Sequence, residues 1–193
     1  MLLGNCYICR LILIMKIMNE IIKKNGIRFG IYTGIFSVLA TIITYAIDLS
    51  LFASIKYGLT LLLAYIVIGI LLLRTTKKEL KGVMTFKEGF TSYFLSIIIG
   101  IPISVLFSII LFNYIDIEAQ DIIKEITIKN TVEAMENWNV PSAQINETIA
   151  EMEKSNPFST LELLKSTIVY IAVYCFIGLI LAAIFKTKST SRE

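Results

Sequence analysis

Few side chains in this sequence have the types and spacing that metal or redox sites use. Cys6 and Cys9 form a Cys-x-x-Cys pair, which occurs in metal and dithiol chemistry. No second pair accompanies it, and the third cysteine, Cys175, lies inside a long apolar stretch. We therefore expect no metal site and no redox centre.

General acid–base chemistry is also poorly supported. The sequence contains no histidine, which removes the most common general base, metal ligand and pH switch of proteins. It shows no nucleophile–base pair, no phosphate-binding loop and no nucleic-acid-binding module. We predict that the protein is not an enzyme, has no catalytic residues and no cofactor, and binds no nucleic acid.

The composition points to the lipid bilayer. Of the 193 residues, 56% are hydrophobic and 17% are charged, and the mean hydropathy is +0.76. Soluble domains are about half apolar and about a quarter charged. The excess of apolar residues therefore indicates a membrane protein.

Four stretches without Asp, Glu, Lys or Arg are long enough to cross a bilayer, which takes about 20 apolar residues. They cover Phe29–Ile47, Tyr57–Leu73, Gly89–Ile115 and Ser166–Phe185. Alternating polar and apolar positions are absent, so these are helices rather than barrel strands. A buried helical bundle in water is the alternative, but such a bundle rarely has four stretches bounded so sharply by charge. We predict an all-α, integral membrane four-helix bundle.

The third stretch has 27 residues and is longer than a bilayer requires. Gly100 and Pro102 lie near its middle, and a proline inside a helix removes one hydrogen bond and favours a kink. One interpretation is a hinge or a partly unwound site of the kind that transporters use. A tolerated membrane proline is the interpretation that we favour.

The basic residues predict the orientation. Thirteen of the 18 lie in the N-terminal region, in the connection between the second and third stretches, or in the C-terminal tail. Because positive loops stay in the cytoplasm, both termini are expected there, as an even number of spans requires. The predicted parts are a cytoplasmic segment 1–26, spans within 27–115, an extracytoplasmic segment 116–165, a fourth span 166–185 and a cytoplasmic tail 186–193.

Segment 116–165 is acidic, with ten acidic and four basic residues. Apolar spacing predicts a helix over Ile117–Trp138, with a break near Lys129, and a second helix that begins at Ser142 after Pro141. We expect an extracytoplasmic helical hairpin. Trp138, the only tryptophan, either anchors it at the lipid headgroups or packs between its two helices.

Small residues mark two predicted helices. Gly26, Gly30 and Gly34 recur every four residues, a spacing that lets another helix approach closely. Such a strip serves either for homodimerisation or for packing within the chain, and we favour the second. Gly178 and Ala182 form a similar strip on the fourth helix and are its expected internal partner.

No charged residue lies at mid-span, since Arg28, Asp48 and Lys56 fall at helix ends. This argues against a transporter with a charged relay. We therefore predict a structural or interaction protein that contacts a protein partner through residues 116–165. The alternative is an oligomeric small-solute transporter or channel subunit, in which Pro102 and span hydroxyls line the route.

Several short motifs follow one another in a recognisable order: Gly26-Ile-Arg-Phe-Gly30, Thr85-Phe-Lys-Glu-Gly-Phe90, Asn113-Tyr-Ile-Asp-Ile117 and Pro141-Ser-Ala-Gln-Ile145. In this order the chain resembles, over about residues 23–188, the bacterial membrane family called domain of unknown function 4199. The resemblance implies a four-helix inner-membrane protein without an assigned activity. Residues 1–14 fall outside it, which fits the hypothesis that translation starts at Met15, and the sequence leaves Met1, Met15 and Met18 open as the start.

Overall fold

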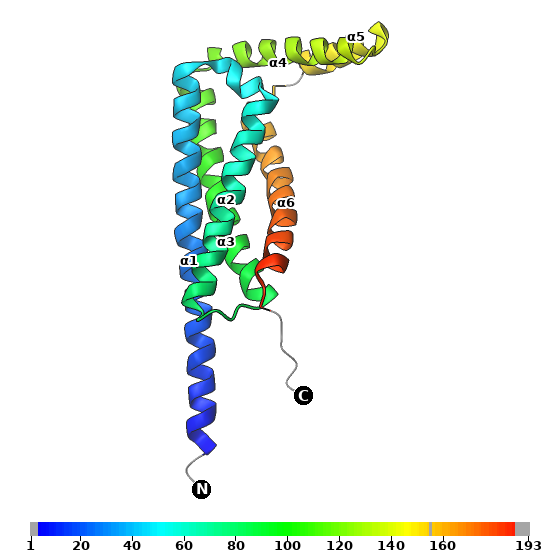
Figure 1. The fold of residues 1–193 in the computed structure, drawn as a ribbon. Coiled ribbons are helices and arrows are strands. Elements are labelled where there is room, and N and C mark those ends of the chain that lie inside the picture. The colour runs from blue at the N-terminus through cyan, green and yellow to red at the C-terminus, as the bar shows by residue number, and fades with distance from the viewer. Residues whose placement is uncertain (1–3, 155, 188–193) are drawn as a thin grey trace. The chain divides into compact units, whose positions relative to one another are not determined.

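The computed structural model describes residues 4–154 and 156–187, with backbone only for residues 4–19. The regular elements of this part are all helical, as predicted (Figure 1). They are α1 (Gly4–Ile47), the 3-10 helix η1 (Leu49–Ala53), α2 (Ile55–Glu79), α3 (Phe86–Ile110), the π-helix η2 (Leu111–Ile115), α4 (Glu118–Asn137), α5 (Ser142–Lys154) and α6 (Thr160–Phe185). The side chains of Cys6 and Cys9 lie outside the described part, as do residues 1–3, where the first candidate start codon falls.

Four helices of the described part are long and apolar enough to cross a membrane. They cover Glu20–Ile47 within α1, Ile55–Glu79, Phe86–Ile115 through α3 and η2, and Thr160–Phe185. Each contains one of the predicted uncharged stretches. The helices extend beyond those stretches because charged side chains at helix ends can reach the membrane surface along their flexible stems.

The exposed surface of these helices is mainly apolar. Large exposed side chains include Ile35, Leu39, Ile43, Leu63, Val67, Leu106, Ile168, Phe176 and Ile180. Several hydroxyl and amide side chains are instead buried, namely Asn25, Ser37, Thr44, Thr76, Ser92 and Ser96. In lipid, apolar side chains face outward and small polar residues line helix contacts. The distribution therefore agrees with a membrane-embedded protein.

Local sequence signals set where the helices begin. The hydroxyl of Thr85 accepts from the amide of Glu88 (3.3 Å), and the Glu88 carboxylate accepts from the amide of Thr85 (2.7 Å). This reciprocal pair caps α3. At α6 the Ser159 hydroxyl accepts from the amide of Glu162 (3.3 Å), while the Glu162 carboxylate pairs with Lys165 (2.6 Å).

Helix α2 ends at a residue in the left-handed conformation. Lys81 has φ 56°. Its amide donates to the carbonyl of Lys78 (3.1 Å), and the amide of Gly82 donates to that of Lys77 (2.9 Å). This is the usual helix-ending pattern in which glycine is preferred at the left-handed position. Asn139, also with φ 56°, follows α4 at the corresponding position.

Helix α4 runs without interruption through Lys129, so the predicted break is wrong. The buried positions of α4 are Ala119, Gln120 and Ile123. Ile123 lies four residues after Ala119 and three after Gln120, so the three side chains form one face near the start of the helix. The apolar residues farther along therefore do not need to share that face, and the mismatch that suggested a break has no structural effect.

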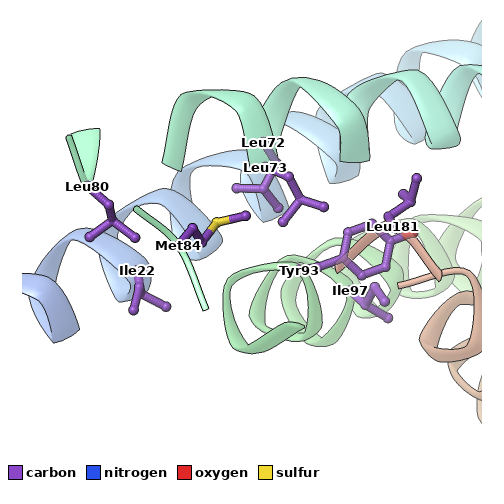
Figure 2. Packing of buried hydrophobic residues seen from close by; sticks show 8 residues of the cluster. All are labelled: Ile22, Leu72, Leu73, Leu80, Met84, Tyr93, Ile97 and Leu181. Carbon is purple, nitrogen blue, oxygen red and sulfur yellow. The ribbon is translucent and has the colours of Figure 1, made fainter. Parts of the chain in front are cut away.

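The described residues form two compact units, and each spanning helix contributes part of its length to both. Unit 1 comprises residues up to Gly34, Ala64–Ile101 and residues from Tyr170 onward. Unit 2 comprises Ile35–Leu63 and Pro102–Val169. The core of unit 1 contains Ile22, Leu72, Leu73, Leu80, Met84, Tyr93, Ile97 and Leu181 (Figure 2). That of unit 2 contains Leu111, Phe112, Ala119 and Ile123.

Tyr93 of α3 is the largest residue of the unit 1 core and is only 3% exposed. Its ring lies against two glycines on different helices. A Cβ atom added to Gly69 of α2 would come 2.5 Å from Tyr93 Cε2, and one added to Gly178 of α6 would come 2.6 Å from Cε1. Both distances are far below van der Waals contact. The absence of a side chain at these two positions therefore makes room for the ring.

Candidate interaction site on helices α4 and α5

Helix α4 is held in unit 2 by its buried face. Ala119 and Ile123 pack with Leu111 and Phe112 at the end of the third span. The ring of Phe112 also makes aromatic contacts, with a centroid distance of 4.8 Å to Phe158. These contacts attach α4 to a membrane-spanning helix through ordinary apolar packing.

A buried glutamine adds directional contacts to this packing. The side-chain nitrogen of Gln120, which is 5% exposed, donates to the carbonyl of Phe112. Its side-chain oxygen accepts from Nδ2 of Asn156 (2.8 Å), which precedes α6. Asn156 Oδ1 in turn accepts from the amide of Phe158 (3.1 Å). One glutamine side chain thus connects α4, η2 and the connection between α5 and α6.

Asp116 connects the start of α4 to α1. Its Oδ2 accepts from the hydroxyl of Tyr45 (2.6 Å), and its Oδ1 accepts from the amide of Ala119 (3.0 Å). The hydrogen bond from Tyr45, with that from the Ala119 amide, lowers the pKa of Asp116 below its ordinary value. The carboxylate is therefore the ionised form that fits this position near a helix N-terminus.

Two further bonds fix α4 along its length. Nδ2 of Asn130 donates to the carbonyl of Ala53 in η1 (3.3 Å). Nζ of Lys124 donates to the carbonyl of Glu153 near the end of α5 (2.5 Å). Helix α4 is thus tied to η1 on one side and to α5 on the other.

The other faces of α4 and α5 carry exposed acidic side chains. They are Glu118, Asp121, Glu125, Glu133 and Glu136 on α4 and Glu147, Glu151 and Glu153 on α5. We refer to these eight residues as the acidic surface. Within the described part of the chain no group of three potential metal-ligating side chains occurs. The acidic surface presents negative charge on helices whose inner side is fixed, and this geometry suits contact with another molecule.

Trp138 lies at the end of α4 and is 79% exposed. This exposure is incompatible with the alternative in which it packs between the two helices. Its role as an anchor at the lipid headgroups remains a prediction.

The glycines of the first predicted strip pack within unit 1. A Cβ atom on Gly26 would lie 2.7 Å from Cβ of Leu95, and one on Gly30 would lie 2.9 Å from Cβ of Ile99. Both contacts are with α3, and Gly100 of α3 in turn lies close to the α1 backbone, since its added Cβ would be 3.0 Å from the Gly30 carbonyl oxygen. Gly34 is buried as well.

The second strip does not have the predicted partner. The contacts of Gly178 are with Tyr93 of α3, and Ala182 lies next to Gly89 of the same helix. The sequence suggested that Gly178 and Ala182 would pack on the strip of α1. Helix α3 is instead the partner of both strips, because its serines and glycines let two helices approach it while Tyr93 fills the space beside α6.

Pro102 lies inside α3, which continues to Ile110 and then into η2. The kink expected at Gly100 and Pro102 stays a prediction. Span hydroxyls donate to carbonyls of their own helices, as in Thr33 to Phe29 (2.8 Å) and Ser96 to Tyr93 (2.7 Å). Such bonds are the common use of hydroxyls in apolar helices.

Sequence reasoning did not find the contacts of Asp116, Gln120 and Asn156. The only signal was the polar Asn113-Tyr-Ile-Asp116 stretch at the end of the third span. Gln120 and Asn156 are 36 residues apart, and no periodicity or motif connects them.

Comparison with known proteins identifies the family. No curated protein and no solved structure matches the chain. Residues 28–187 match a family described as "Protein of unknown function (DUF4199)". This range covers more than half of the chain and agrees with the resemblance seen in the sequence. The chain therefore belongs to the DUF4199 family.

Proposed function

We propose that the protein is a multi-pass protein of the bacterial inner membrane that works as a non-enzymatic interaction protein. Its four spans form a bundle with both termini in the cytoplasm. Helices α4 and α5 form an extracytoplasmic hairpin, and the acidic surface is where a protein partner binds.

The observation that carries this proposal is the way in which α4 is held. Gln120 and Asp116 fix its inner face through hydrogen bonds to η2, to the segment before α6 and to α1. The charged side chains of its outer face are exposed. A surface that is ordered before binding loses less entropy when a partner binds, which favours affinity.

The proposed orientation rests on charge. The region from the end of α2 to the start of α3 carries Arg74, Lys77, Lys78, Lys81 and Lys87, whereas segment 116–165 has an excess of six acidic residues. The positive-inside rule favours the first on the cytoplasmic side and leaves the second outside.

Cysteine labelling in intact cells tests the orientation. In a chain with Cys6, Cys9 and Cys175 changed to serine, a membrane-impermeant maleimide should label Asn139→Cys. Lys81→Cys should react only after the membrane is opened. The opposite pattern would show that the proposed orientation is wrong.

Site-specific photo-cross-linking tests the partner surface. A photoreactive residue at Glu133 or Glu151 should give discrete adducts of defined mass. The matched controls are the exposed apolar positions Leu63 and Ile180, which should not give these adducts. Charge reversal at Glu125 should weaken the Glu133 adducts severalfold. The same adducts at the acidic and the control positions would argue against the proposal. So would Glu133 adducts that charge reversal at Glu125 leaves unchanged.

An oligomeric small-solute transporter or channel subunit is supported less well. Its route would need span hydroxyls that face a passing solute. The hydroxyl of Thr44 donates instead to the carbonyl of Ala40 (2.8 Å) and also pairs with the hydroxyl of Tyr57.

A further inference from the structure

Helix α6 packs against α3 in an antiparallel alignment that continues to the end of α6. Ala182 lies next to Gly89. Five residues later along the chain, Thr187 donates its amide to the carbonyl of Met84 (2.8 Å), and its hydroxyl accepts from the Met84 amide (3.0 Å). Met84 precedes Gly89 by the same five residues. The end of α6 therefore lies beside the start of α3 within unit 1 (Figure 1).

This alignment brings lysines from separate segments to one place. The hydroxyl of Thr187 donates to the carbonyl of Gly82 (3.1 Å). Lys186 directly precedes Thr187, and Lys81 directly precedes Gly82. Because neighbouring Cα atoms are 3.8 Å apart, the Cα atoms of the two lysines lie within about 16 Å of each other. Lys87, in the first turn of α3, adds a third positive charge at the same end. We refer to Lys81, Lys87 and Lys186 as the lysine cluster.

The charges of the lysine cluster are available to another molecule. All three side chains are exposed, and within residues 4–154 and 156–187 none of them forms an ion pair. Lys77 differs from them, because its Nζ donates to the carbonyl of Phe185 (3.0 Å). That carbonyl belongs to the last turn of α6, where carbonyls lack a partner within the helix. Lys77 thus fixes the end of α6, and the cluster surrounds the fixed end.

Two carboxylates at this end of unit 1 bind neutral donors. Oε2 of Glu79 accepts from Nδ2 of Asn25 (3.1 Å). Oε2 of Glu88 accepts from the amide (2.7 Å) and the hydroxyl (2.9 Å) of Thr85. Two negative charges therefore stand against the three of the lysine cluster and those of the neighbouring Lys77 and Lys78. The excess of positive charge favours an anionic partner.

The lysine cluster lies where the spans end. The span of α2 ends at Glu79 and that of α6 at Phe185, while that of α3 begins at Phe86. Lys81 follows the first of these ends by two residues, and Lys186 follows the second by one. In a bilayer, charged groups at such positions reach the level of the lipid phosphates.

Apolar side chains are exposed beside the cluster. Val83, between α2 and α3, is 61% exposed and Phe86 is 39% exposed. The ring of Phe86 stacks on that of Phe90 with a centroid distance of 6.3 Å, and Phe90 stacks on Phe94 at 5.9 Å. These rings form an apolar strip that runs from the cluster along the span of α3. A soluble anion would leave Val83 and Phe86 in water, whereas a lipid would cover them.

We propose that the lysine cluster binds the phosphate of an anionic phospholipid, whose acyl chains lie along the strip of Phe86, Phe90 and Phe94. The phosphate connects the end of α6 with the connection between α2 and α3, and so strengthens a contact that Thr187 already makes. This inference concerns unit 1 and does not rest on the proposed function of α4 and α5. It does not rest on the proposed orientation either, because phosphates lie at both surfaces of a bilayer.

Native mass spectrometry of the full-length protein in detergent provides the test. Phosphatidylglycerol or phosphatidylcholine with the same acyl chains is added in steps, and the affinity for the first bound lipid is measured. A lysine near an anionic surface contributes about fivefold in affinity. We expect phosphatidylglycerol to bind at least about tenfold more tightly than phosphatidylcholine. Equal affinities would overturn the proposal.

A pair of double variants tests the position of the site. Lys81→Gln with Lys186→Gln should bring the affinity for phosphatidylglycerol to within about fivefold of that for phosphatidylcholine, since Lys87 remains. Lys56→Gln with Lys154→Gln is the matched control, because it removes two equally exposed charges that lie in unit 2. It should keep the full preference. An equal loss in both double variants would show a general attraction by net charge and overturn the proposal.

A soluble competitor tests whether the partner is a lipid. Glycerol phosphate has the anionic group of phosphatidylglycerol without its chains. Added at the same concentration, it should not displace the bound lipid, because it cannot cover Val83 and Phe86. Displacement would show that the lysine cluster takes a free phosphate, and the assignment to a phospholipid would be wrong.

Discussion

Units 1 and 2 are built from the same four spans, yet different interactions hold them. In unit 1 the helices approach through glycines, and Tyr93 fills the space beside Gly69 and Gly178. In unit 2 hydrogen bonds from Gln120 and Asp116 connect helix ends. Lipid is as apolar as a leucine side chain, so shape decides how helices pack within it. At helix ends some backbone groups have no hydrogen-bond partner within the helix, so hydrogen bonds from polar side chains can determine how the ends pack.

The largest effect should come from filling the space beside Tyr93. Gly178→Val would force the ring or helix α6 to move, because an added Cβ already overlaps Tyr93. We expect a loss of about 3 kcal/mol in the free energy of unfolding. Reversible unfolding in mixed micelles would measure it. Gly58→Ala is the control, since nothing lies within 4 Å of its added Cβ. A similar loss in both variants would contradict steric packing as the cause.

The next effect should come from the hydrogen bonds of unit 2. Gln120→Leu keeps the volume but leaves the Phe112 carbonyl and the Asn156 amide without their partner. The expected loss is about 2 kcal/mol, measured in the same unfolding assay. Gln144→Leu, at an exposed position of α5, should change stability little. If Gln120→Leu were as stable as the control, packing alone would hold α4.

A smaller, pH-dependent effect should come from Asp116. Its hydrogen bonds to Tyr45 and the Ala119 amide lower its pKa in the folded protein. The stabilisation is therefore present above the unfolded pKa of about 3.9 and is lost as the pH falls through the lower folded value. We expect the melting temperature to fall more in wild type than in Asp116→Asn between pH 5 and strongly acidic buffer. If the melting temperatures of the two proteins changed equally with pH, Asp116 would not contribute to the pH dependence of stability.

The smallest effect should be an increase in stability at Lys81. This residue has φ 56°, a conformation that glycine adopts without strain. Lys81→Gly should stabilise the protein by about 0.5–1 kcal/mol. Lys78→Gly, inside the last turn of α2, should instead destabilise it by about 1 kcal/mol. Two destabilised variants would indicate that the Lys81 side chain makes a contact that outweighs the strain.

The spans could be predicted because lipid imposes a length and a composition that charged residues mark sharply. The caps at Thr85 and Ser159 could be predicted because both partners lie within four residues. The partner of the glycine strip could not, since spacing shows that Gly26 permits close approach but not which helix approaches. The Gln120–Asn156 contact could not be predicted either, because it joins residues that only the folded chain brings together.

Thr187, just beyond α6, has a consequence for how that helix is positioned. Its amide donates to the Met84 carbonyl (2.8 Å), its hydroxyl accepts from the Met84 amide (3.0 Å), and the same hydroxyl donates to the Gly82 carbonyl (3.1 Å). From Ser166 to Phe185 the helix has no charged residue, so this part could slide by a turn along its neighbours at little cost. Thr187 at one point and Gly178 at another fix the distance that α6 must span between them. A single residue inserted between these two positions would therefore break either the hydrogen bonds of Thr187 or the packing of Gly178 against Tyr93.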